Sequence, residues 1–181
     1  NDVTIGGMTH NICRPQTLYV LRWLYTKKRE SNTRANIYTS ANFLTKKSII
    51  FSNPFDEKIK TYGYEDLLFF KLLELNGISP KFINNPVRHD CNEDPKTFIK
   101  KTEEALKNLK KLSLEHTELF NDNRIIKFHK RLKILHLDTI FCRFFSLTKV
   151  MLLKNLHSSY PSLFIFDLYK LGYFCKIKQN D

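Results

Sequence analysis

Two adjacent carboxylates, Glu65 and Asp66, stand in the stretch YGYEDLLFF, directly after an aromatic-glycine-aromatic turn and at the start of an apolar segment. Acidic side chains are favoured in the first turn of a helix, because they face the positive end of its dipole and accept hydrogen bonds from free N–H groups. A helix cap is therefore the ordinary explanation. The alternative is catalysis, since a carboxylate held at the rim of an apolar wall becomes more basic through desolvation.

Residues that could bind a metal are few and scattered along the chain. His89 and Cys91 are close in sequence, but a structural zinc site needs four ligands, and the other Cys and His residues show no paired spacing. His89 alone is either a strand-end histidine bonded to the backbone or a ligand. The sequence contains no GxSxG motif and no Walker-type loop.

The elements that must position these residues follow from the spacing of apolar residues and from Gly and Pro. A short β-branched run predicts a strand at residues 3–5, which stops at the pair Gly6-Gly7. Further along, the patterns predict a helix at 15–28, a short strand followed by a helix or turn before Pro54, a helix at 64–76, and an extended segment at 78–90.

From Asp94 onward the sequence is helical in pattern, with apolar residues at helical spacing and Pro95 in the first turn. Three further helices are predicted at about residues 122–137, 139–156 and 161–174. The chain is therefore expected to consist of a small α/β piece, residues 1–92, followed by an all-helical basic tail, residues 93–181.

The segment FDEKIKTYGYEDLLFFKLLELNGI, preceded by SANFLTKKSIIF and followed by NNPVRHD, resembles the C-terminal half of the catalytic domain of family 2 glycosyltransferases of bacterial type. These enzymes have the GT-A fold. The resemblance covers about residues 1–92, and it rests on the order of four features: a glycine loop, an Asn-Phe strand, an ED helix and a His. That order is far more specific than any one of its elements.

The resemblance implies a role for each residue of the carboxylate pair. In the family, the last Asp of the YGYED motif is usually the catalytic base of inverting members, and this position is Asp66. Glu65 is expected to orient Asp66 or to bind hydroxyl groups of the acceptor, and Tyr64 is expected to contact substrate. The reaction implied is hexosyltransferase-like: a sugar passes from a nucleotide-sugar donor to a hydroxyl of a saccharide or lipid-linked acceptor, in the synthesis of a cell-envelope polysaccharide or glycolipid.

Four other positions correspond to the donor side of the family's site. Gly6 and Gly7 look like the glycine loop near the donor sugar, although a Gly pair can simply permit a turn. Asn42 is either a turn residue or a contact to the donor sugar. His89 lies where many GT-A enzymes carry a His that completes the site of a divalent Mg or Mn ion.

The family's N-terminal half, with its nucleotide-binding βα units and DxD metal motif, has no counterpart in these 181 residues. The pair Asp56-Glu57 does not replace the DxD, because it follows the Asn-Phe strand instead of preceding the glycine loop. We therefore expect a C-terminal fragment of a longer enzyme that is inactive alone, with the main metal ligands in the other half.

The net charge of +12 predicts anionic partners, and residues 122–181 hold 11 Lys and Arg against 4 Asp and Glu. Nucleic acid is not favoured, because no binding motif is present. The tail either packs on the catalytic domain or makes peripheral contact with a membrane. Four scattered cysteines and the lack of a signal peptide favour a cytoplasmic setting, with the inner face of the cell membrane as the place of contact. The competing functional hypothesis is a noncatalytic helical module that binds an anionic membrane or polyanion surface.

Overall fold

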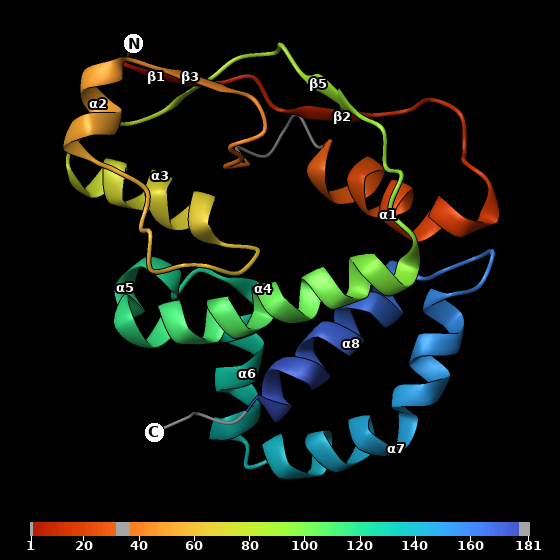
Figure 1. The fold of residues 1–181 in the computed structure, drawn as a ribbon. Coiled ribbons are helices and arrows are strands. Elements are labelled where there is room, and N and C mark those ends of the chain that lie inside the picture. Colours follow the sequence, from red (N-terminus) through yellow and green to blue (C-terminus); the bar gives the residue numbers. More distant parts are fainter. Residues whose placement is uncertain (1, 32–36, 178–181) are drawn as a thin grey trace.

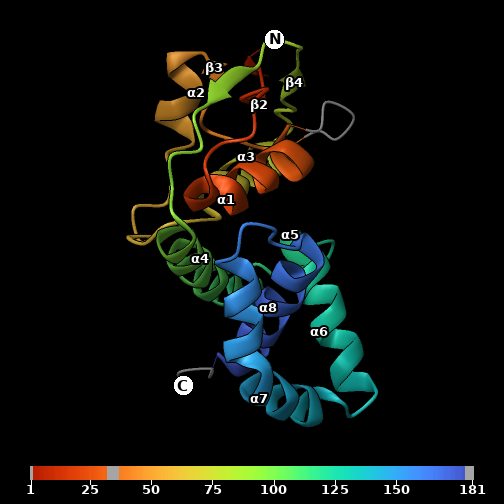
Figure 2. The same cartoon turned by 90° about the vertical axis from the view of Figure 1, so that its right-hand side faces the viewer.

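The computed structural model describes residues 2–31 and 37–177, which form a mixture of helices and two small sheets (Figure 1). The strands lie at one end of the molecule and the C-terminal helices at the other, as both views show (Figure 2). The mixed composition agrees with the predicted α/β class. Within the described residues, no helix combines the length and apolar composition that a bilayer-spanning segment requires.

The larger sheet is built around β1 (Val3–Ile5), the predicted first strand. It pairs antiparallel with β3 (Phe43–Thr45) and parallel with β4 (Lys81–Phe82). Beyond the Gly pair, β2 (Met8–His10) pairs parallel with β5 (Val87–His89), so that His10 stands opposite His89. The sequence did not predict β2, because its three residues are all half-buried and show no alternation of apolar and polar side chains.

The predicted helix at residues 15–28 is confirmed, although its hydrogen-bond pattern changes along its length. A 3₁₀ turn, η1 (Thr17–Tyr19), leads into α1 (Val20–Tyr25), and the chain continues as a π-helical turn, η2 (Thr26–Glu30). Isolated π-helical turns of this kind occur often at functional sites.

The two helices that flank the YGYED turn also lie where the sequence predicted helical structure. They are α2 (Lys47–Ser52) and α3 (Glu65–Leu75). Helix α3 ends at Asn76, and Gly77 follows with a φ of +76°, so the predicted Asn-Gly stop is confirmed.

The predicted helical tail is confirmed as five helices: α4 (Pro95–Glu115), α5 (Thr117–Phe120), α6 (Arg124–Ile134), α7 (Asp138–Leu156) and α8 (Leu163–Lys176). Side-chain caps fix three of their starts. Asp94, Asn123 and Ser162 each accept a hydrogen bond from a main-chain N–H of the first turn, in α4, α6 and α8 respectively.

Helix α3 forms a wall between the sheet and the helical tail. One face, with Phe69, Phe70 and Leu73, packs against Val3 and Ile5 of β1. The other face packs through Leu68 into a cluster formed by the tail, whose buried members are Leu106, Leu109, Leu112, Phe120, Ile126 and Phe174. The helix that carries the carboxylate pair therefore packs against the tail on one face and against the sheet on the other.

Candidate active site

Asp66 lies in the first turn of α3, and its carboxylate is held by two main-chain donors. Its Oδ1 accepts a hydrogen bond from the N–H of Leu67 at 2.8 Å, and its Oδ2 accepts one from the N–H of Ser40 at 3.3 Å. Burial raises the pKa of Asp66 above its ordinary value, the neighbouring charge of Glu65 raises it further, and the two hydrogen bonds oppose both effects. Desolvation therefore outweighs the stabilisation that a simple helix cap would give.

Glu65 is the first residue of α3 and stands directly beside this carboxylate. Its Oε2 is shielded from solvent and accepts no hydrogen bond from the described residues. Most buried polar atoms in proteins have a partner, because leaving one unpaired costs free energy. Because this oxygen is shielded, a bound molecule does not reach it in this conformation, and the effect of Glu65 that the structure shows is its charge, which raises the pKa of Asp66.

The turn that leads into α3 is fixed by helix α4. The Nδ2 of Asn108 donates to the carbonyl oxygens of Thr61, Tyr62 and Gly63 at 2.9, 3.2 and 3.1 Å. Gly63 has a φ of +102°, and a Cβ there would lie 2.4 Å from the Cβ of Ala105, so only glycine lets α4 approach this closely. The position of the carboxylate pair is thus set by a helix of the tail.

Tyr64 adopts a left-handed backbone conformation, with a φ of +69°, immediately before α3. Its ring packs edge-on against Phe120 of α5, with 6.5 Å between ring centroids, and burial raises the pKa of its hydroxyl. The side chain therefore belongs to the core between α3 and the tail. This arrangement favours a structural role, and the predicted contact with substrate stays a prediction.

The glycine pair and Asn42 form one tightly bonded unit at the end of β1. The side-chain Nδ2 of Asn42 donates to the main-chain carbonyl oxygens of Gly7 at 3.0 Å and Asn85 at 2.8 Å. The main-chain carbonyl oxygen of Asn42 accepts a hydrogen bond from the N–H of Gly6 at 2.9 Å. A Cβ on Gly6 would lie 2.4 Å from that Nδ2, and Gly7 has a φ of +79°. Close packing therefore requires glycine at position 6, the positive φ favours glycine at position 7, and Asn42 acts here by holding the turn.

The structure brings several of the predicted site residues to one place. Ser40, which donates to Asp66, lies two residues before Asn42, and Asn42 is bonded to the glycine turn. One segment therefore joins the carboxylate to Gly6 and Gly7, with Glu65 beside it. Tyr64 is directed toward the helical tail instead.

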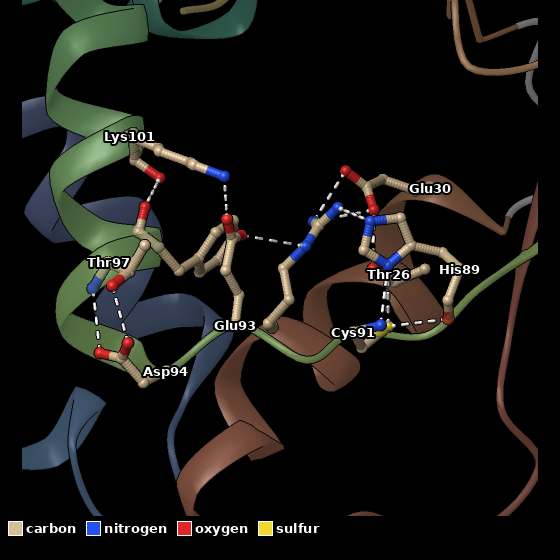
Figure 3. A network of polar contacts seen from close by, with 11 residues as sticks. Thr26, Glu30, His89, Cys91, Glu93, Asp94, Thr97 and Lys101 are labelled. Atoms are coloured by element: carbon tan, nitrogen blue, oxygen red, sulfur yellow. Dashed lines mark hydrogen bonds and ion pairs between the residues drawn. The ribbon is translucent and has the colours of Figure 1, made fainter.

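His89 belongs to a separate polar network between α1, β5 and the start of α4 (Figure 3). Its Nε2 lies 3.1 Å from Nη2 of Arg22, and its Nδ1 accepts from the N–H of Cys91 at 2.9 Å. Burial lowers the pKa of His89, and the positive charge of Arg22 lowers it further, so the ring is neutral. Each ring nitrogen therefore has an N–H group as its neighbour, and a neutral imidazole, which carries one N–H itself, accepts at only one of them.

Arg22 is the centre of this network and is only 5 % exposed. Its Nη1 pairs with Glu30 at 2.9 Å, its Nε lies 3.7 Å from Glu93, and its guanidinium stacks over the ring of Phe98 at 5.0 Å. Glu30 also accepts from the hydroxyl of Thr26 at 2.7 Å, within the π-helical turn. The sequence pattern did not predict this network, although Arg22 stands out as a charged residue within the apolar run YVLRWLY.

The predicted role of His89 as a metal ligand can be compared with this geometry. A ligating imidazole presents a lone pair to the ion, but here one nitrogen faces a guanidinium cation and the other a main-chain N–H. Within residues 2–31 and 37–177, no group of three His, Cys, Asp or Glu side chains is placed to hold a metal. The residues present therefore do not fit the ion, and the predicted Mg or Mn stays an expectation for the half that would carry the DxD motif.

Comparisons of the chain with family models, with curated proteins and with solved structures find no match.

Proposed function

We propose that this chain forms the acceptor side of an inverting family 2 glycosyltransferase, with Asp66 as the general base. The environment of Asp66 is the observation that carries the proposal. Its carboxylate is made more basic by burial and by Glu65, and it is oriented by the N–H groups of Leu67 and Ser40. The proposal includes a GT-A arrangement, in which the same polypeptide supplies the nucleotide-binding half.

In the proposed reaction, an acceptor hydroxyl transfers its proton to the carboxylate of Asp66 as its oxygen attacks the anomeric carbon of the donor sugar. The new bond joins that oxygen to the anomeric carbon. The bond from this carbon to the diphosphate oxygen breaks, and the nucleoside diphosphate departs with the bonding electrons. Attack from the side opposite the leaving group inverts the configuration of the carbon, and Asp66 supplies the base on the acceptor side. A divalent ion held by the other half would stabilise the charge of the departing diphosphate.

The neighbouring residues support this chemistry in different ways. Glu65 acts through its negative charge, which raises the pKa of Asp66 and so makes that carboxylate a stronger base. Asn42 holds the turn at Gly6 and Gly7 in one conformation. The main chain of this turn is the proposed contact for the donor sugar. Saccharide or lipid-linked acceptors of cell-envelope synthesis are the proposed substrates, with a nucleotide sugar as donor.

The pH dependence of transfer tests this proposal. Because the pKa of Asp66 is raised, we expect kcat/KM of the enzyme with both halves to fall on the acid side with a midpoint above the ordinary Asp value of about 3.9. Below that midpoint the base is protonated and cannot accept the proton. Since Glu65 contributes to the shift, Glu65→Gln should move the midpoint downward. A midpoint at the ordinary value, unchanged by Glu65→Gln, would exclude Asp66 as the base.

A further inference from the structure

Helix α7 carries large apolar side chains on two opposite faces, and the fold uses only one of them. Phe145, Leu152 and Leu156 are buried against α8, where a Cβ on Gly172 would lie 2.2 Å from the ring of Phe145. The other face is exposed, with side chains between 49 and 83 % accessible; we call this set the α7 stripe, and it consists of Ile140, Phe144, Leu147, Val150 and Met151.

The α7 stripe is continuous along the helix. Residues 140, 144, 147 and 151 follow one another at the spacing of a single helix face, and Val150 lies next to that row. In both views the first part of α7 crosses the end of the molecule away from the strands, and the second part turns back from that end (Figure 1 and Figure 2). The packing of the chain therefore does not account for these apolar side chains, and a contiguous exposed apolar face of this kind marks an interaction surface.

The charge around the α7 stripe is strongly positive. From residue 124 to 156 the chain holds eight Lys and Arg and one acidic residue, Asp138. In the described part of the chain, none of these eight forms an ion pair with a carboxylate. Helix α6, which contacts α7, supplies five exposed cations: Arg124, Lys127, Lys130, Arg131 and Lys133.

We propose that the α7 stripe and the cations of α6 dock the protein on the surface of an anionic phospholipid bilayer. A helix that lies in the interface buries its apolar face among the lipids while neighbouring Lys and Arg side chains approach anionic headgroups. The neighbouring helices α7 and α6 offer these two features, and the proposal does not depend on the transferase activity.

Two other occupants fit the same surface less well. A second copy of the chain carries the same net charge of +12, and like charges on two partners oppose their association. A nucleic acid would satisfy the cations, but Phe144 is the one aromatic side chain of the α7 stripe, so the stripe provides little stacking surface for bases. Of these three occupants, only an anionic bilayer would interact favourably with both the α7 stripe and the cations of α6.

Vesicle co-sedimentation of the 181-residue chain tests the proposal. We expect binding to vesicles that contain phosphatidylglycerol and phosphatidylcholine, weakened by salt, and little binding to phosphatidylcholine alone. The double variant Leu147→Gln/Met151→Gln should bind about tenfold or more weakly, because it removes two inserted side chains. The double variant Lys127→Gln/Arg131→Gln should also bind more weakly.

The chain offers a matched control for the loss of exposed apolar side chains. Leu44 and Phe51, on β3 and α2, are 76 and 73 % exposed, close to the 83 and 71 % of Leu147 and Met151. We expect Leu44→Gln/Phe51→Gln to bind like the wild type, and all variants to show the circular dichroism and thermal unfolding of the wild type. Equal loss in the control pair, unchanged binding of the stripe variant, or equal binding to both lipid compositions would overturn the proposal. The proposal would also be overturned if the wild type formed a dimer that does not bind vesicles while the stripe variant was monomeric.

Discussion

Replacing Asp66 by Asn is expected to lower the rate of sugar transfer about 100-fold to 10,000-fold, the usual loss when a general base is removed. The amide keeps the shape of the carboxylate but cannot accept the acceptor's proton. Donor binding should be unchanged, because Asp66 acts on the acceptor side in the proposed reaction. The measurement is kcat/KM for transfer, together with the Kd of the donor, in the enzyme with both halves.

The same variant should keep nearly the stability of the wild type at neutral pH. The folded-state pKa of Asp66 is raised, so the folded protein favours the protonated form, and ionisation at neutral pH opposes folding. Asn removes this opposition, but its single acceptor oxygen keeps only one of the two main-chain hydrogen bonds, so the two effects offset each other and the free energy of unfolding should stay within about 1 kcal/mol of the wild type at pH 7. The gain from removing the charge should fade as the pH falls below the ordinary Asp pKa, where both states of the wild type are protonated.

A carboxylate of the helical tail that pairs with α3 provides the control for Asp66→Asn. Asp122 pairs with Lys71 of α3, and its side chain is 70 % exposed, so Asp122→Asn should change neither the rate nor the stability appreciably. An Asp66→Asn enzyme that keeps more than half of the wild-type rate would rule out Asp66 as the base. An activity loss that merely follows unfolding would count against a catalytic role as well.

Replacing Arg22 by Met is expected to reduce the free energy of unfolding of the 181-residue chain by about 3–5 kcal/mol. Met preserves the apolar stem of the side chain, but it leaves Glu30 and Glu93 without their shared cation in a partly buried site. Urea unfolding followed by circular dichroism measures the loss. Adding Glu30→Gln to the Arg22→Met variant should restore part of it, because one unpaired charge is removed.

An exposed ion pair in the same part of the chain is the control for Arg22→Met. Arg29 pairs with Asp167 at 2.6 Å, and the two side chains are 39 and 43 % exposed. Solvent screens such a pair, so Arg29→Met should cost about 1 kcal/mol or less. Similar losses for the two variants would show that the network around Arg22 does not hold α1, β5 and α4 together in the way described.

The helices were predictable because local signals coincide with their boundaries. Asp94 before Pro95 marks the start of α4, and Asn76-Gly77 marks the end of α3. The strand β2 was not predictable from its own three residues, because its conformation depends on parallel pairing with β5, about 80 residues away. The change to a π-helical turn at Thr26–Glu30 likewise has no local sequence signal.

The candidate site was predictable only where its residues form a sequence motif. Asp66 and Glu65 follow a recognisable turn, whereas the network of Arg22 joins residues far apart in the sequence and becomes visible only in the fold. The burial of Tyr64 depends on α5, which packs against it from the tail. The two faces of α7 are equally apolar in the sequence, so only the structure distinguishes the buried Phe145 from the exposed Phe144.

The configuration of the product tests the central claim most directly. The enzyme with both halves would be incubated with a panel of nucleotide sugars and with saccharide or lipid-linked acceptors, and the anomeric configuration of the product would be determined by NMR. The account predicts acceptor-dependent release of nucleoside diphosphate and a glycoside of inverted configuration, with both products lost in Asp66→Asn. A product of retained configuration would contradict direct displacement assisted by Asp66. Failure of every nucleotide sugar to react would contradict the transferase proposal and favour a noncatalytic helical module.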